Sequence, residues 1–269
     1  MNWKNIFAGA AVFALSAALL TGCGGSEKKV ASTDNAAEMG KIIVGLDDNF
    51  PPMGFKNEKN EITGFDVDLA KEAAKRLGRE VEFKAIDWSS KEAELKSGRV
   101  QILWNGLDIT EKRKENMLFS NPYMDNRQII FVKKGNTAVT DEKSLAGKTV
   151  GTQSAGTAEE YLDATEFYKT DVKAVKKYPD YVAAFMDLEN GRLDAVIGDE
   201  IVGRYYMSKH PDQLEALDVV VGPTSEFGIA FAKDNTALRD EVQKVLDEMK
   251  KDGTIAKIST EWFTKDITK

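Results

Sequence analysis

The stretch Trp104-Asn105-Gly106-Leu107-Asp108-Ile109-Thr110-Glu111-Lys112-Arg113 determines how the rest of this chain is organised. It follows an apolar run, residues 100–104, which predicts a buried strand that ends at a Gly turn. Thr110 is a typical N-cap residue, so a short polar helix should begin there and carry Arg113 in its first turn. Helix N-terminal amides and a forked guanidinium both favour a small carboxylate. The alternative is that Arg113 is a solvated member of the charge run 111–115, since surface charges are the default in short helices.

Strands and helices alternate on both sides of this stretch. Apolar runs and alternation predict strands at 41–47, 80–86, 100–104, 148–152, 171–176 and 193–197. Apolar residues at helical spacing predict helices at 67–77, 157–163 and 179–190, and Ser89-Ser90-Lys91-Glu92 reads as a capping box that opens a further helix. Strands that alternate with helices favour right-handed crossovers, so we expect an α/β protein with two mainly parallel sheets.

The two halves also resemble each other in sequence. Ser97-Gly98-Arg99-Val100-Gln101 leads into the Gly106–Asp108 turn, and Asn190-Gly191-Arg192-Leu193-Asp194 leads into the turn Gly198-Asp199-Glu200. Ligands of open α/β sheets bind beyond the carboxyl ends of the strands. Two facing sheets would therefore place residues 106–113 and Asp199 on opposite walls of one cleft. A match this short can also arise by chance.

Two segments are expected to cross between the halves. One is residues 127–133, and the other is 217–221 with 227–232; an amphipathic helix at 236–251 and a final helix at 255–263 follow. We therefore predict a first lobe formed by residues 41–125 plus 224–269 and a second lobe formed by 126–223, joined by a two-strand hinge.

The N-terminal residues have the pattern of a secretory signal. One Lys precedes an apolar stretch, residues 6–20, that is too short for a comfortable membrane span. The run Leu20-Thr21-Gly22-Cys23 resembles a lipobox, which predicts a signal peptide at 1–22 and lipidation of Cys23. Residues 23–40 are rich in small and polar residues and predict a flexible tether. The alternative is an ordinary signal with a chance Cys.

Composition excludes several classes of function. The chain has 37 Lys+Arg against 44 Asp+Glu, and nucleic-acid binding requires clustered basic charge. Gly147-Lys148-Thr149 lacks the earlier Gly of a phosphate-binding loop. His210 is the single histidine and Cys23 the single cysteine, which argues against a Ser/His/Asp hydrolase and a conventional zinc site. We expect no metal and no cofactor, and we interpret His210 as a solvated turn residue.

Six short motifs together are specific for one family. They are Val44-Gly45-Leu46-Asp47 with Phe50-Pro51-Pro52, Gly64-Phe65-Asp66-Val67-Asp68-Leu69, the stretch 105–113, Phe119-Ser120-Asn121-Pro122-Tyr123, Gly191-Arg192-Leu193-Asp194-Ala195 and Gly228-Ile229-Ala230-Phe231. On these motifs the chain, over about residues 41–263, resembles the polar amino acid-binding proteins of ABC transporters, solute-binding protein family 3. The resemblance implies a periplasmic-binding-protein-like fold of type II. It also implies that the chain captures an amino acid outside the cytoplasm by hinge closure and delivers it to a membrane permease.

The resemblance assigns the ligand's charged groups to particular residues. Arg113 would bind the α-carboxylate, and the amide of Thr157 would donate to the same group. Asp199 would bind the α-ammonium with help from the Gly106 carbonyl. This division of charge fits a zwitterion, whose ionic groups leave water favourably only when each is paired.

The resemblance also assigns residues to the ligand side chain. Phe50 and Trp88 would flank it as aromatic walls, the alternative for both being core packing. Two positions depart from common family members, because Asp108 stands where a hydroxyl residue is usual and Gln153 stands where glutamine-type members have Lys. Asp47, Asp108 and Asp199 then face one cation, so we expect a basic amino acid first, glutamine or cystine next and acidic amino acids last. Alternatively, Asp108 pairs with Arg113.

Two other classes of protein are alternatives to a binding protein. Cyclohexadienyl dehydratases resemble these binding proteins, and Asp108 or Glu226 would have to act as their general acid in the cleft. A sensor module would need a further membrane or kinase segment after residue 269. We expect instead a monomeric binding protein, anchored by lipid to the extracytoplasmic face of the cell membrane, with a free amino acid and an ABC permease as its partners.

Overall fold

The computed structural model describes residues 40–269. The predicted signal peptide 1–22, Cys23 and all but the last residue of the predicted tether 23–40 lie outside the described residues. In the described part no helix is long and apolar enough to cross a membrane.

The first sheet holds the strands on which the opening stretch lies. Its order is β5 (Glu80–Ala85), β1 (Lys41–Leu46), β6 (Ile102–Asp108), β14 (Ser225–Ala232) and β7 (Met117–Phe119), with β8 (Met124–Asn126) also paired to β14. β1 runs parallel to β5 and β6, whereas β14 is antiparallel to β6, β7 and β8. A small separate sheet comprises β2 (Asn49–Phe50), β3 (Gly54–Lys56) and β4 (Ile62–Thr63).

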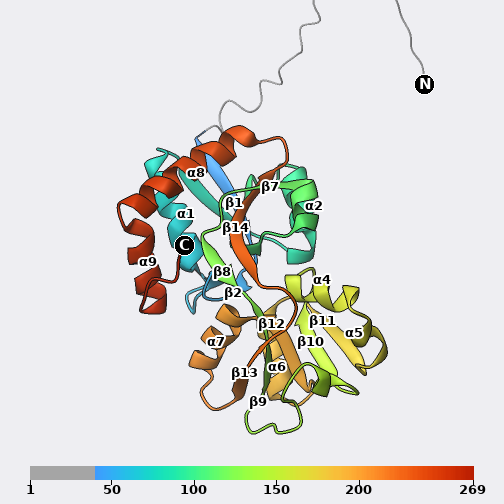
Figure 1. The fold of residues 1–269 in the computed structure, drawn as a ribbon. Coiled ribbons are helices and arrows are strands. Elements are labelled where there is room, and N and C mark those ends of the chain that lie inside the picture. The colour runs from blue at the N-terminus through green and yellow to red at the C-terminus, as the bar shows by residue number, and fades with distance from the viewer. Residues whose placement is uncertain (1–39) are drawn as a thin grey trace, which may run out of the picture. The chain divides into compact units, whose positions relative to one another are not determined.

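Helices cover both faces of the first sheet (Figure 1). They are α1 (Phe65–Arg76), α8 (Thr236–Lys251) and α9 (Thr254–Phe263) on one side, and η2 (Trp88–Ser90) with α2 (Lys91–Lys96) on the other, while α3 (Glu111–Asn116) follows β6. Successive residues of β6 alternate between the two layers, as a strand requires. Ile102 and Trp104 join the apolar cluster of α1 and α8, and Leu103 joins the cluster of Trp88 and Leu95.

The second sheet is built like the first, with five strands in one path and helices on both faces. Its order is β11 (Ala174–Tyr178), β10 (Thr149–Gln153), β12 (Ala195–Asp199), β9 (Gln128–Lys133) and β13 (Leu214–Val220). Its helices are η3 (Lys143–Leu145), α4 (Thr157–Ala164), α5 (Glu166–Thr170), α6 (Tyr181–Glu189) and α7 (Glu200–Lys209). Phe131 packs with Phe185 of α6, and Ile130 packs in the cluster of Leu162 from α4, so this sheet is also buried on both faces.

The chain passes between the sheets at two places. The first is Arg127, between β8 and β9, and the second is residues 221–224, between β13 and β14. Because β9 and β14 enter antiparallel to β12 and β6, both sheets are mixed. The prediction that both sheets are mainly parallel is therefore wrong in this detail, since only the β–α–β units contribute parallel pairs of strands.

Two local predictions at the site also need correction. β6 does not end at a Gly turn but continues through Gly106 to Asp108, because β14 pairs with it over Leu107 and Asp108. The capping box at 89–92 does not form: Asp87 caps η2 by accepting from the Ser89 amide, and Ser90 makes no side-chain cap bond. The Thr110 cap is confirmed, because its side chain accepts from the Arg113 amide.

Candidate functional site

The carboxyl ends of β6, β10 and β12 meet around a small cavity. Its lining residues come from the two large sheets, from β2 of the small sheet, and from η2, α3 and the start of α4: Phe50, Trp88, Gly106, Asp108, Arg113, Gln153, Gly156, Thr157 and Asp199. The cavity volume is about 10 Å³, roughly one water molecule. Every sequence-predicted binding residue except Asp47 lines this cavity, and Asp47 is hydrogen-bonded to the lining residue Gln153.

Arg113 is the buried cation of this site. Its residue is 2% exposed, so the interpretation of Arg113 as a solvated member of a charge run is wrong. Nη1 donates to the Asp108 carbonyl at 3.0 Å, and Nη2 donates to the Glu160 carboxylate at 3.0 Å and to the Ala155 carbonyl at 3.4 Å. Among the described residues, Nε has no hydrogen-bond partner. A buried guanidinium N–H without a partner is unfavourable, which marks it as a donor available to another group.

The N-terminus of α4 faces the same cavity. Gly156 precedes the helix and Thr157 is its first residue, so the Thr157 amide has no intrahelical partner. The partial positive charge of a helix N-terminus adds to that of Arg113. These groups favour an anion at this end of the cavity.

Asp108 and Asp199 face each other across the cavity, and Asn126 lies between them. The Asn126 amide nitrogen donates to Asp108 at 3.0 Å and also to Asp199. Ser225 donates to Asp108 at 2.6 Å, and Gln128 donates to Asp199 at 2.9 Å. The side chain of Asp108 therefore bonds to neutral donors, and Arg113 reaches only its carbonyl.

Burial sets the protonation of these carboxyl groups. Desolvation, followed by the nearby Asp108, raises the pKa of Asp199 to about 7. Burial also raises the pKa of Asp108, although Ser225, Thr157 and Arg113 oppose the change. Two carboxylates so close cannot both ionise without cost. A cation placed between them would lower both pKa values.

Asp47 and Gln153 form a second polar pair that joins the two sheets. Gln153 Nε2 donates to Asp47 at 2.6 Å and to the Pro179 carbonyl at 3.3 Å. Desolvation raises the pKa of Asp47 to about 7, against a hydrogen bond from the Asn49 amide. Both residues are buried, so this carboxyl group also lacks a positive partner in the site.

The absence of a side chain at Gly106 leaves room for Phe50, one of the two aromatic walls. Phe50 and Trp88 line the cavity and are 4% and 6% exposed, so each also packs in an apolar cluster. Gly106 has φ 55°, and a Cβ there would lie 2.8 Å from the Phe50 ring. The Gly106 amide donates to the buried Asp66 carboxylate at 2.7 Å. A larger residue at 106 would therefore displace Phe50.

Sequence reasoning missed three polar residues of the site. Asn126 is the bridge between Asp108 and Asp199, and no motif singles it out. Glu160 lies one helical turn after Thr157, and that spacing could have indicated it. The sequence places Lys91 only within a capping box, but it is 3% exposed and donates to the Ala155 carbonyl at 2.8 Å.

Other candidate residues lie away from the small cavity. Glu226 is half-exposed, pairs with Lys269 and lines a separate, larger groove, so it is not an acid within the small cavity. His210 ends α7, stacks on Tyr206 with ring centroids 4.0 Å apart and lies 3.1 Å from Glu189. It is therefore a packed helix-end residue that is only partly exposed. Among the described residues, no group of His, Cys, Asp and Glu could hold a metal ion.

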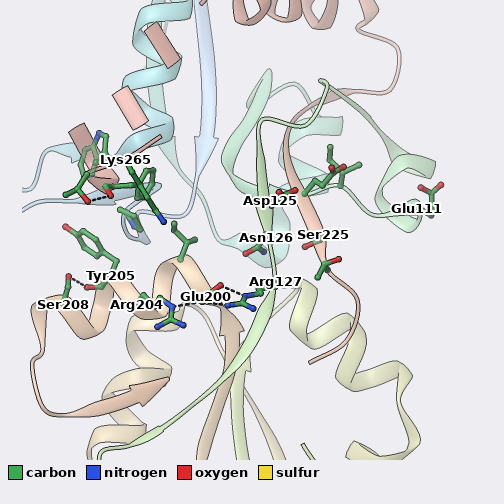
Figure 2. A pocket seen from close by; sticks show the side chains of 18 of the residues that line it. Glu111, Asp125, Asn126, Arg127, Glu200, Arg204, Tyr205, Ser208, Ser225 and Lys265 are labelled. Carbon is green, nitrogen blue, oxygen red and sulfur yellow. Dashed lines mark hydrogen bonds and ion pairs between the residues drawn. The ribbon is translucent and has the colours of Figure 1, made fainter. Parts of the chain in front are cut away.

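A larger groove of about 1140 Å³ lies beside the first crossing segment. Figure 2 shows Arg127 pointing to Glu200, which also pairs with Arg204. Tyr205 and Lys265 line the groove farther along. Its labelled arginines are paired with carboxylates, whereas the small cavity holds the buried Arg113 with a free N–H. Size alone therefore does not identify the functional site.

The match to a known family covers almost all described residues. Residues 42–265 match the bacterial extracellular solute-binding proteins, family 3. The chain belongs to this family, which confirms the family indicated by the sequence motifs.

Similar proteins of known name are amino acid-binding proteins. The L-cystine-binding protein TcyJ of Escherichia coli K12 is 34% identical over 86% of this chain and 86% of its own length. ABC transporter arginine-binding protein 1 of the same strain is 33% identical over 86% of this chain and 94% of its own.

Solved structures are similar over the same range. An ancestral arginine-binding protein bound to arginine has a TM-score of 0.79 and 40% identity, covering 83% of this chain and 98% of that one. A histidine-bound substrate-binding protein of an ABC uptake transporter from Streptococcus pneumoniae has a TM-score of 0.81 and 31% identity, covering 88% and 99%. The type II periplasmic-binding-protein fold is therefore confirmed, and these relatives are binding proteins rather than enzymes.

Proposed function

We propose that this chain captures a free polar L-amino acid, with basic amino acids preferred, and delivers it to the permease of an ABC importer. One observation carries the proposal: Arg113 and Asp199, of opposite charge and 2% and 6% exposed, line one cavity from the two sheets. The free Nε of Arg113 gives this cavity a donor for a carboxylate. An α-amino acid carries the two complementary charges at a short fixed distance.

The proposed roles follow from the positions of the groups. Arg113 and the Thr157 amide bind the α-carboxylate, because a guanidinium and a helix N-terminus both favour an anion. Asp199 and the Gly106 carbonyl bind the α-ammonium. Asp108 completes the negative potential around that ammonium through its Asn126 bridge.

The ligand side chain would lie between Phe50 and Trp88 and extend toward Asp47 and Gln153. A ligand cation near Asp47 would stabilise the charged carboxylate that burial disfavours. The Gln153 amide would then be free to turn its oxygen toward the ligand. This arrangement favours arginine, lysine or histidine, then glutamine or cystine, over acidic amino acids.

Entry of an amino acid requires the cavity to open. A volume of about 10 Å³ is far below that of an amino acid, so the two walls have to separate. We propose that residues 41–125 with 224–269 move as one lobe and 126–223 as the other. The two crossing segments would act as the hinge, and a bound ligand would stabilise closure because it contacts both lobes.

We further propose that the chain binds its ligand without turnover and acts as a monomer. A lipid anchor at Cys23 would hold it on the extracytoplasmic face of the membrane. Asp108 is enclosed by hydrogen bonds from Asn126 and Ser225, and Glu226 lies outside the cavity. No observation therefore favours the dehydratase alternative. The anchor is supported by the Leu20–Cys23 motif.

A panel of amino acids tests the proposed ligand class. We expect arginine, lysine or histidine to raise the Tm most in a thermal-shift series, and Asp47→Asn to weaken arginine binding in calorimetry. Asp48→Asn is a matched control, because that neighbouring carboxylate pairs with Lys56. The charge argument fails if glutamate or an aliphatic amino acid binds most tightly, or if Asp47→Asn leaves arginine affinity unchanged.

Arg113→Lys should weaken amino acid binding by roughly ten- to a hundredfold, since hydrogen bonds to charged groups contribute about 1.5–3 kcal/mol and a point charge cannot replace a planar fork. Isothermal titration calorimetry measures the change, and circular dichroism checks the fold. Arg99→Lys makes the same substitution at an exposed ion pair and should bind normally. Equal affinities of the two variants would remove Arg113 from the site.

Binding should release protons below neutral pH. In the closed cavity, burial and the nearby Asp108 raise the pKa of Asp199 to about 7, and an ammonium beside it favours the carboxylate, so its pKa falls when the ligand is held there. Affinity should therefore rise with pH up to about 7 and level off above it, by at most about tenfold per unit for one proton. Calorimetry in buffers of different ionisation enthalpy counts the protons. A constant affinity from about pH 5.5 to 8 would contradict the assignment of Asp199.

Processing before Cys23 is checked by mass. Protein extracted from the membranes of a native host should lack residues 1–22 and carry added acyl chains. Recovery of soluble protein with an unmodified Cys23 thiol would contradict the anchor and leave the binding proposal untouched.

A further inference from the structure

Lys91 is a buried cation whose ammonium bonds to backbone oxygens. It is the first residue of α2, on the first-sheet side of the cavity, and it is 3% exposed. Nζ donates to the Trp88 carbonyl at 3.3 Å and to the Ala155 carbonyl at 2.8 Å, and it lies 5.1 Å from the centre of the Trp88 ring. Burial of an ammonium is unfavourable unless its hydrogen bonds are satisfied, so these carbonyls are essential to its position.

The Ala155 carbonyl belongs to the opposite wall of the cavity. Ala155 follows β10 of the second sheet and stands two residues before α4 begins at Thr157. It has φ 55°, in the left-handed region, and its amide donates to Glu159 of α4. Arg113 Nη2 also donates to the Ala155 carbonyl, at 3.4 Å. Two cations of the first-sheet side thus converge on one oxygen of the second.

We propose that Lys91 is a positioning residue that latches the two walls of the cavity together through the Ala155 carbonyl. In doing so it holds the first turn of α4 against Arg113, so that the Thr157 amide and the guanidinium point at the same carboxylate. This inference rests on the proposed amino acid-binding function and deepens it. The contact crosses the cleft through protein groups alone, so Lys91 acts on closure without touching the amino acid.

The charges around Lys91 suit a contact that exists only when the walls meet. Burial, followed by repulsion from Arg113, lowers the pKa of Lys91 to about 8, while Glu92, Glu160 and Glu159 act in the opposite direction. The ammonium is therefore still protonated at neutral pH. Separation of the walls would return the ammonium to water and remove the Ala155 oxygen, so the hydrogen bond stabilises the closed arrangement against opening.

Lys91→Met tests the latch, because methionine has a similar length and no donor. In stopped-flow Trp fluorescence with L-arginine, we expect the dissociation rate to rise roughly tenfold or more, as for loss of a charged hydrogen bond, with a much smaller change in association rate. Lys96→Met is the matched control, since Lys96 lies exposed on the same helix. Equal dissociation rates of the two variants would overturn the proposal.

The Tm distinguishes a lysine that holds the two walls together from a lysine that only supports the fold. Methionine at this position avoids the unfavourable burial of an ammonium. We therefore expect the Tm of Lys91→Met without added amino acid to equal or exceed that of wild type, while arginine leaves faster. A fall in Tm with an unchanged dissociation rate would mean that Lys91 only supports α2.

A distance measurement keeps the test independent of the ligand's identity. Spin labels at exposed positions 84 on β5 and 176 on β11, in a Cys23→Ser background, report the separation of the two sheets in the full chain. We expect Lys91→Met to shift the distance distribution toward longer values and Lys96→Met to leave it unchanged. If wild type binds none of L-arginine, L-histidine, L-glutamine and L-cystine, the proposed function fails. The distance measurement then tests the latch by itself, and superimposable distance distributions of wild type and Lys91→Met would overturn it.

Discussion

The site depends on the burial of one positive charge, that of Arg113, which deprotonation cannot remove. Arg113 is 2% exposed, and a guanidinium stays protonated at any physiological pH. Its compensation comes from three separate segments: the Asp108 carbonyl at the end of β6, the Ala155 carbonyl after β10 and the Glu160 carboxylate of α4. These segments have to meet at one point for the fold to tolerate the charge. The convergence of strand ends and the burial of Arg113 are therefore one constraint.

The acidic side of the site meets the opposite problem. Asp47, Asp108 and Asp199 are all buried, and burial raises the pKa of each. Neutral amides of Asn126, Gln128 and Gln153 supply their hydrogen bonds in place of cations. Amide donors satisfy the oxygens without cancelling charge, so each of these carboxyl groups that ionises adds negative potential beside the partly unpaired guanidinium of Arg113.

Sequence reasoning recovered what depends on local chemistry. The long helix at 236–251 and the Thr110 cap follow from periodicity and capping, and both are as expected. The length of β6 was underestimated because its last residues are held by β14, more than 100 positions later in the chain. Lys91 and Asn126 were missed for the same reason. Their acceptors on the second sheet's side, Ala155 and Asp199, lie 64 and 73 residues away, and no local pattern reports such a distance.

The path of the chain also constrains the order in which the molecule is assembled. β6 lies between β1 and β14, so its second edge stays without a partner until residues 225–232 have been made. The second sheet has no such gap, because all its strands lie between residues 128 and 220. Long-range pairing is slow, and an open strand edge can pair with other chains. The half that is inserted in the sequence can therefore fold before the half that surrounds it, and β6 is the edge at risk of aggregation during synthesis and export.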